Sequence, residues 1–319
     1  MAKSRVKYRA IEGNSRGYIL LLGALLLVAG MGLLAAHHME TVGHIVTGMN
    51  NQVVWGLPHV FAVFLIVAAS GALNVASISS VFQRKTYKPL SRLSGIVAIA
   101  LLAGGLMVLV LDLGRPDRLL VTVTHINLKS IFTWNILLYS GFFAVVAVYL
   151  WMMMERKMNQ YSRQAGITAF IWRLILTTGT GSIFGFLVAR QGFDAAIYAP
   201  MFIIMSFSFG LALFLIVLIT AYEFTGRELG YKVLDTLSNL LGVFIAAVLF
   251  FVLIYHLTNL YATEHHGWEG FILAGMHGGG VYATIFWLFQ ILLGSLLPMA
   301  MIFSGRVKQN PKMVLIAAG

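Results

Sequence analysis

The stretch LALFLIVLITA, Leu211–Ala221, is continuously apolar and contains no charged side chain. A helix that crosses the hydrocarbon core of a membrane needs about 20 mostly apolar residues, and this run lies within one of eight such segments. They cover residues 17–36, 55–82, 93–112, 131–154, 170–189, 197–222, 236–261 and 278–303. A transmembrane β-barrel would show alternating segments of about 10 residues, whereas this run and Ala68–Ala76 do not alternate. The sequence therefore predicts an all-α, polytopic membrane bundle of about eight helices.

The composition agrees with this interpretation. Hydrophobic residues make up 59% of the 319 residues and charged residues only 10%, and the mean hydropathy is +0.87; soluble domains are far more polar. The first segment is long enough to span, and no small-residue cleavage site clearly follows it, so we expect it to be retained. The expected organisation is a basic tail at 1–16, a membrane domain at 17–303 and a tail at 304–319, whose apolar end resembles the start of a further span.

The distribution of Lys and Arg predicts the orientation, because cations are retained on the cytoplasmic side of a membrane. Seventeen of the 22 basic residues fall in the two tails and in three alternate loops, which predicts that both termini are cytoplasmic. These residues are Lys3, Arg5, Lys7, Arg9, Arg16, Arg84, Lys85, Lys88, Arg92, Arg156, Lys157, Arg163, Arg227, Lys232, Arg306, Lys308 and Lys312. The net charge of +11 therefore reflects topology, not nucleic-acid binding. The absence of cysteine excludes disulfides, thiolate metal sites and iron–sulfur clusters from this chain.

The histidines show the opposite bias. With this topology all nine lie in outer loops or at the outer ends of spans: His37, His38, His44, His59, His125, His256, His265, His266 and His277. Histidine titrates near neutral pH and is a common metal ligand. One face is thus equipped for proton exchange or metal binding, unless longer outer loops simply hold more histidines.

The segment LDLGRPDRLLVTVTHINLKSIFTWN, residues 111–135, places two Asp, three basic residues and a His between two apolar runs. Charges at a membrane boundary are costly and usually functional. The structural alternative is a helix stop, with Gly114 in the left-handed conformation and Pro116 preventing continuation.

Topology brings further polar groups to the same level. His59 lies about one turn into the second helix, Asp112 ends the third, and the fourth begins with Trp134 and Asn135 close to its start. We therefore expect one outer pocket between these three helices, with the acid–base groups, donors and flat ring that a quinone head group requires. The expected roles are proton exchange for His59 and Asp112, hydrogen-bond donation for Arg115 and Asn135, ring stacking for Trp134, and an outer proton exit at His125. Alternatively, Trp55 and Trp134 are interfacial anchors and His59 is structural.

Several motifs together resemble one family. WGLPH (Trp55–His59), GALNVAS (Gly71–Ser77), LDLGRPDRL (Leu111–Leu119) and KSIFTWN (Lys129–Asn135) resemble the NrfD/polysulfide-reductase membrane-subunit family. Within it, the stretch His37–Phe61 is most similar to DsrP-type subunits of the transmembrane complex associated with dissimilatory sulfite reductase.

This resemblance implies a quinone-binding subunit of a respiratory or sulfur-metabolism complex in a bacterial or archaeal cytoplasmic membrane, not a stand-alone enzyme. The quinone would be menaquinone or ubiquinone. The implied partner is an extracytoplasmic ferredoxin-like iron–sulfur subunit. The DsrP-type setting adds a multihaem cytochrome c, a b-type cytochrome and a cytoplasmic iron–sulfur subunit.

Two other classes remain as alternatives. A b-type cytochrome needs axial histidines inside the bundle, and only His59 and His256 lie within spans. A secondary transporter would fit a broken fifth helix at TGTGSIFG, Thr178–Gly185, next to Arg173 near the inner end of that helix; the packing alternative is a close helix contact at these glycines. The outer clusters at residues 37–44 and 264–269 have no known zinc spacing, so we expect partner contacts there and no metal.

Overall fold

The structure is a computed structural model that describes residues 16–51, 53, 55–227, 229–304 and 310–319. Lys3, Arg5, Lys7, Arg9, Arg306 and Lys308, which contributed to the predicted orientation, lie outside these residues. The described residues form helices joined by turns and loops and contain no β-strand. The all-α prediction is therefore confirmed.

Eight helical spans in the described residues are long and apolar enough to cross a membrane. They are built from α1 (Arg16–Val42), α2 (Leu57–Ala72) with α3 (Asn74–Ser80), η2 (Lys85–Leu90) with α4 (Ser91–Leu111), α6 (Ile131–Met154), η4 (Asn159–Tyr161) with α7 (Ser162–Gly185), α8 (Tyr198–Phe224), α9 (Tyr231–Tyr261), and α11 (Gly280–Thr284) with the π-helix η7 (Ile285–Leu296) and α12 (Leu297–Phe303). The remaining elements are η1 (His44–Thr47), η3 (Pro116–Arg118), α5 (Leu119–Thr124), η5 (Thr263–His265), α10 (His266–Leu273), η6 (Met276–Gly278) and α13 (Pro311–Ala318). The predicted number of spans is confirmed.

The fifth span differs most from its prediction. The predicted segment is 170–189, whereas α7 runs from Ser162 to Gly185. The prediction excludes the first turns, SRQAGITA, because they are too polar to be recognised as part of an apolar segment. Arg173 therefore lies midway along this 24-residue helix, and its predicted place near the inner end is wrong. The glycine-rich segment 178–185 is continuous helix. Gly181 packs against the backbone of Tyr198 and Ala199 at the start of α8, which supports the packing interpretation rather than a broken helix.

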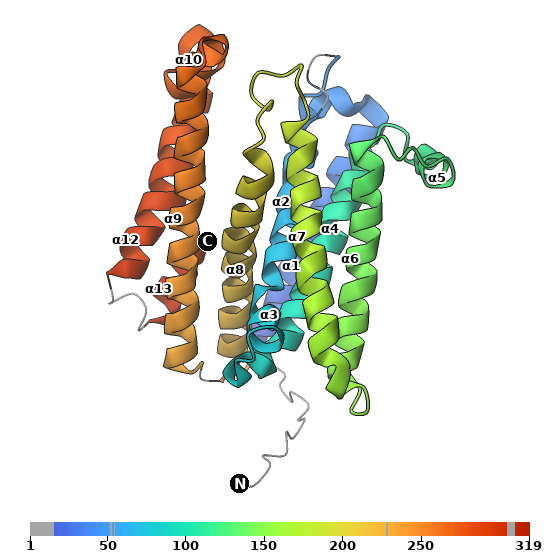
Figure 1. The fold of residues 1–319 in the computed structure, drawn as a ribbon, viewed down its shortest axis with the longest axis vertical. Helices are drawn as coiled ribbons and strands as arrows, with labels where there is room; N and C mark the ends of the chain where they lie inside the picture. Colours follow the sequence, from blue (N-terminus) through green and yellow to red (C-terminus); the bar gives the residue numbers. More distant parts are fainter. Residues whose placement is uncertain (1–15, 52, 54, 228, 305–309) are drawn as a thin grey trace.

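The spans alternate in direction, so the bundle has two distinct ends. Figure 1 shows α5 and α10 at one end, which also holds the first turn of α2 and every histidine. We call this the histidine end. The opposite end carries Arg84, Arg92, Arg156, Arg163, Arg227, Lys232 and other basic residues, and we call it the basic end.

The second span lies at the centre of the first half of the bundle. α2 packs against α4, α7 and α8, and its residues from Ile66 to Ala72 are buried. A Cβ atom at Gly71 would overlap the carbonyl oxygen of Ser206, and one at Gly210 would overlap the backbone of Gly71 and Ala72. Small residues thus allow α2 and α8 to approach closely. This contact fixes the depth and rotation of α2, whose first turn carries His59.

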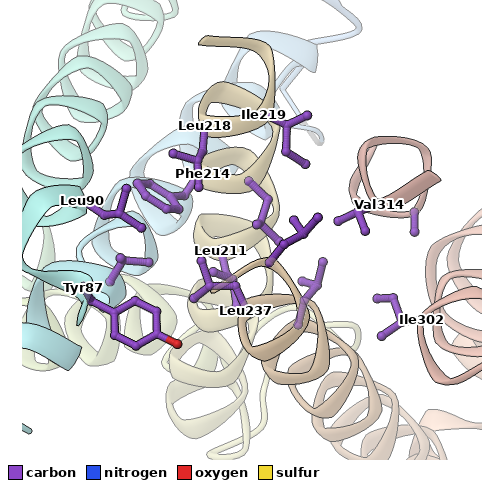
Figure 2. Packing of buried hydrophobic residues seen from close by; sticks show 14 of the residues in the cluster. Tyr87, Leu90, Leu211, Phe214, Leu218, Ile219, Leu237, Ile302 and Val314 are labelled. Carbon is purple, nitrogen blue, oxygen red and sulfur yellow. The ribbon is translucent and has the colours of Figure 1, made fainter. Parts of the chain in front are cut away.

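A second core joins α8 and α9 to the C-terminal helices. Figure 2 shows Leu211, Phe214 and Leu218 along α8, with Leu237 close to Leu211. Ile302 of α12 and Val314 of α13 belong to the same buried cluster. The C-terminal residues 310–319 are therefore packed against the bundle as α13, with Val314 and Ala317 buried. By contrast, α1 buries only Met39 along its length, so its apolar surface faces outward.

Candidate functional site

A carboxylate and an imidazole meet at the histidine end. Pro58 occupies the first turn of α2, where its missing N–H costs nothing, and His59 follows in the same turn. Asp112 ends α4, and its backbone N–H donates to the carbonyl of Val108 at 3.0 Å. The Oδ2 atom of Asp112 lies 3.3 Å from Nδ1 of His59. The structure therefore joins the second and third spans through these two side chains.

The end of α4 does not follow the structural alternative of a simple helix stop. Gly114 is not among the residues with positive φ, so it does not adopt the left-handed conformation that this alternative requires. Pro116 instead begins the separate element η3. The carboxylate of Asp112 consequently faces His59 rather than serving the local turn.

Asp112 is also the site of an unsatisfied buried atom. Its side chain is 5% exposed, and its second oxygen, Oδ1, is buried without a hydrogen-bond partner among the described residues. A buried carboxylate oxygen without a donor is destabilising by about 1–3 kcal/mol or more. The atom is therefore suited to accept a hydrogen bond from a ligand, or to carry a proton and donate one.

Trp55 stacks on the imidazole ring of His59, whose Nδ1 atom faces Asp112. The two rings are stacked, with centroids 5.0 Å apart and an angle of 3° between their planes. The edge of Trp55 also meets Phe184 from the end of α7 at 5.3 Å, and Phe193 from the connection between α7 and α8 at 6.0 Å. These contacts fix the indole and hold the imidazole plane in one orientation.

A cavity of about 380 Å³ lies between the start of α2 and the end of α7. Its lining residues are Val53, Trp55, His59, Val60 and Val63 on one side, and Phe184, Leu187, Arg190 and Phe193 on the other. An apolar concave wall with a few polar groups is typical of small-molecule sites. The cavity therefore differs from the pocket predicted between the second, third and fourth spans, because its walls come from the start of α2, the end of α7 and the α7–α8 connection, and none of its lining residues belongs to α4 or α6.

The two predicted residues of α6 face elsewhere. Asn135 is buried and donates through Nδ2 to the carbonyls of Ile131 at 2.9 Å and Gly179 at 3.2 Å, so it links α6 to α7. Trp134 is 47% exposed and donates its indole N–H to the carbonyl of Leu128 at 2.9 Å. The structure therefore does not bring either residue to the cavity; an exposed Trp at a span end is typical of an interfacial anchor.

Arg115 and His125 also lie apart from the cavity. Arg115 is exposed and binds the Asp117 carboxylate with both Nε and a terminal nitrogen, at 3.0 and 2.9 Å. This hydrogen bond lowers the pKa of Asp117 and raises that of Arg115. His125, at the end of α5, is exposed, with Nδ1 3.0 Å from the hydroxyl of Thr124. Of the six predicted site residues, only His59 and Asp112 are therefore brought together.

Most of the cavity lining was not predicted, including the aromatic and charged residues Phe184, Arg190 and Phe193. The sequence carried a signal for Arg190, because it is a charged residue at the outer boundary of two spans. Charges at such a boundary are costly, and the same argument drew attention to residues 111–135. No comparable signal marked the two phenylalanines among the 22 in the chain.

The second half of the bundle contains another pair of this type. Nδ1 of His256 lies 2.7 Å from Oε2 of Glu269, which is 1% exposed, and Nδ2 of Asn259 donates to Oε1 of Glu269 at 2.8 Å. His59 and His256, the two histidines considered as haem ligands, each face a carboxylate rather than each other. Within the described residues, no three His, Asp or Glu side chains are arranged to hold a metal ion.

These features define a multi-pass helical membrane protein with an apolar cavity beside a buried carboxylate–imidazole pair. The family model for polysulphide reductase, NrfD, matches residues 45–319, and the chain belongs to the NrfD family. This agrees with the resemblance of its motifs.

Several known proteins are similar along most of the chain. The Hdr-like menaquinol oxidoreductase integral membrane subunit of Archaeoglobus fulgidus is 27% identical, over 98% of this chain and 78% of the relative. A putative dimethyl sulfoxide reductase membrane subunit of Halobacterium salinarum is 28% identical, over 95% and 73%. A selenate reductase subunit of Mesobacillus selenatarsenatis is 24% identical, over 88% and 74%. All three are subunits of oxidoreductases by name.

Proposed function

We propose that this protein is the quinone-binding membrane subunit of an electron-transfer complex of respiration or sulfur metabolism. The observation that carries the proposal is the cavity lined by the stacked Trp55 and His59, with the imidazole of His59 paired to the buried carboxylate of Asp112. The relative from Archaeoglobus fulgidus, a menaquinol oxidoreductase subunit by name, supports the same class of ligand.

The residues fit a quinone head group. A quinone supplies two-electron chemistry coupled to two protons, and its head presents two carbonyl oxygens on a flat ring. His59 lines the cavity and its Nδ1 lies 3.3 Å from Oδ2 of Asp112, and a paired acid and base can exchange protons with a bound ligand. Arg190 supplies a charged donor for a carbonyl oxygen. Trp55, Phe184 and Phe193 provide aromatic walls for the ring.

The polarity of the cavity favours menaquinone over ubiquinone. His59, Arg190 and the indole N–H of Trp55 are the polar groups among its lining residues, and the remaining surface is apolar or aromatic. The fused second ring of a naphthoquinone is apolar, whereas the two methoxy groups of ubiquinone bring oxygens that this wall would leave without donors. Burying unpaired polar groups is unfavourable, so the naphthoquinone is the better match.

Electrons must be exchanged with a partner, because this chain contains no cysteine to hold an iron–sulfur cluster. We assign this role to an extracytoplasmic ferredoxin-like iron–sulfur subunit docked at the histidine end. The orientation follows from the charge bias, with the basic end and both termini in the cytoplasm and the chain in the cytoplasmic membrane of a bacterium or archaeon. A multihaem cytochrome c, a b-type cytochrome and a cytoplasmic iron–sulfur subunit would complete a complex of the DsrP type.

The test is a titration of the purified full chain with menadione, a naphthoquinone without an isoprenoid tail, following tryptophan fluorescence. The parent should show saturable quenching, and Asp112→Asn should weaken binding about tenfold, or ~1.4 kcal/mol, since the acid–base pair loses its charge. Asp117→Asn is the matched control, because Asp117 is exposed and binds Arg115; its affinity should equal that of the parent. Quenching that does not saturate in the parent would refute the proposal.

A further inference from the structure

One wall of the cavity belongs to a segment without regular helix. The connection between α7 and α8, residues 186–197, provides Leu187, Arg190 and Phe193 to the lining. Hydrogen bonds within the segment, such as Phe193 N–H to the Arg190 carbonyl at 2.9 Å, form turns only. The position of Arg190 relative to His59 therefore depends on contacts that other elements make with this connection.

The strongest of these contacts converge on the carbonyl oxygen of Gly192. The hydroxyl of Tyr198, in the first turn of α8, donates to it at 2.5 Å, and the hydroxyl of Tyr255, from α9, donates to it at 2.7 Å. The two phenol rings lie 5.4 Å apart, and Tyr255 is only 7% exposed. A carbonyl has two lone pairs, so both acceptor sites of Gly192 are occupied by tyrosines from two different helices.

Gly192 is also enclosed by α10. A Cβ atom at this position would overlap the indole ring of Trp268, so the absence of a side chain lets the connection lie directly against α10. Phe193, the next residue, contacts Tyr198 at 6.2 Å between ring centroids and Trp55 at 6.0 Å. The wall thus connects the stacked rings of the cavity to the tyrosines of the second half of the bundle.

A buried polar network holds the supporting residues in place. Glu269 follows Trp268 in α10, and its two oxygens bind His256 and Asn259 of α9. A buried carboxylate is tolerated only when paired and hydrogen-bonded, so this network fixes α10 on α9. The ring of His256 in turn contacts Tyr255 at 5.0 Å. Both supports of Gly192 from the second half, Tyr255 and Trp268, are therefore adjacent to Glu269 or its partner.

We propose that Tyr198 and Tyr255 are positioning residues for the quinone site, which act by clamping the Gly192 carbonyl so that Arg190 and Phe193 stay at the cavity. The second half of the bundle then sets the affinity of a site whose acid–base groups lie in the first half. This inference rests on the proposed function, because it assigns a role toward the same ligand. The Glu269 network serves as the support of the clamp and does not touch the ligand.

The experiment compares Tyr198→Phe, Tyr255→Phe and the double variant in the full chain. Each substitution removes only a hydroxyl. Tyr261→Phe is the matched control, because Tyr261 lies on α9 and is 91% exposed. Two readouts are needed: amide hydrogen exchange of residues 186–197 without ligand, and the affinity for menadione from tryptophan quenching.

Amide exchange in residues 186–197 should quicken by about tenfold in the double variant, and menadione should bind about fivefold more weakly to Tyr255→Phe than to the parent. In an Arg190→Ala background, Tyr255→Phe should weaken binding by less than it does in the parent, because the part of the clamp's effect that acts through Arg190 is already lost and only the part through Phe193 remains; a loss that does not depend on these two residues would keep its full size there.

Unchanged exchange in the double variant, or unchanged affinity in both single variants of a parent that binds menadione, would overturn the inference. A parent that does not bind menadione refutes the proposed function and, with it, the role of the clamp toward that ligand, whereas the exchange readout still reports on the clamp itself. The two failures are therefore distinguishable.

Discussion

The Nδ1 atom of His59 lies 3.3 Å from the Oδ2 atom of Asp112, although α3 and η2 separate their helices along the chain. Each side chain is largely buried, at 16% and 5% exposure. Trp55 stacks on a face of the same imidazole. His59 thus connects the buried carboxylate to the cavity that it lines.

Replacing His59 should weaken ligand binding. His59→Gln keeps a polar side chain but removes the group that exchanges a proton with Asp112, so the affinity for menadione should fall about tenfold, or ~1.4 kcal/mol. His125→Gln is the control, because His125 is exposed on α5, and its affinity should stay at the parent value. Equal affinities for the two variants would show that the imidazole of His59 does not contribute.

The fluorescence signal itself should come from Trp55. This tryptophan lines the cavity, whereas Trp134 is 47% exposed and hydrogen-bonded to Leu128. Trp55→Phe should therefore remove most of the saturable quenching, and Trp134→Phe should leave it in place. The reverse result would move the ligand to α6, where the sequence alone placed the stacking wall.

Arg190 and Arg115 distinguish two assignments of the charged hydrogen-bond donor: the structure favours Arg190, whereas the sequence predicted Arg115. Arg190 lines the cavity, and Arg115 is committed to Asp117 on the surface. Since a charged hydrogen bond contributes about 1.5–3 kcal/mol, Arg190→Ala should weaken menadione binding by at least tenfold. Arg115→Ala should bind as the parent does in the same titration, and a large loss there would restore the original assignment.

The sequence predicted the spans because each carries its own apolar signal, and it predicted the approach of His59 and Asp112 because alternating spans place both at one end. It could not predict helix rotation. Trp134 and Asn135 are adjacent on a helix and hence about 100° apart around its axis, so which of them faces a given neighbour depends on a rotation that the sequence pattern does not specify. Asn135 instead faces Gly179 of α7, and this choice depends on packing between helices rather than on any local pattern.

The part of the site supplied by the α7–α8 connection was unpredictable for a related reason. Loop residues have no periodic signal, and the carbonyl of Gly192 in this connection is bound by Tyr255, which lies 63 residues further along the chain. Similarly, the polar first turns of α7 concealed its true start, which misplaced Arg173 along the span.

The close crossing of α2 and α8 should be intolerant of added volume. Gly71→Ala would place a methyl group on the carbonyl of Ser206, and overpacking of this kind costs about 1–3 kcal/mol or more. The thermal midpoint of the purified chain in detergent should therefore fall. Gly23→Ala on α1, where no neighbouring atom lies within 4 Å, should leave the midpoint unchanged or slightly higher. If both variants melt together, the crossing is looser than the structure indicates.

Arg173 should be sensitive to the shape of its cation. Its guanidinium lies 4.7 Å from the ring centroid of Phe170 and 4.9 Å from that of Phe207, and it donates to the carbonyl of Ser70 at 3.4 Å. Its Nε is buried without a partner among the described residues. A compact ammonium cannot stack flat on two rings, so Arg173→Lys should lower the free energy of unfolding by about 1–2 kcal/mol.

Two further variants isolate the reason for this loss. Arg163→Lys changes an exposed residue in the first turn of α7 and should not alter the thermal midpoint. Arg173→Met removes the buried charge while keeping an apolar stem, and such replacements are often neutral or stabilising, so its midpoint should lie above that of Arg173→Lys. A methionine variant less stable than the lysine variant would mean that the positive charge, and not the stacked planar group, stabilises the middle of the bundle.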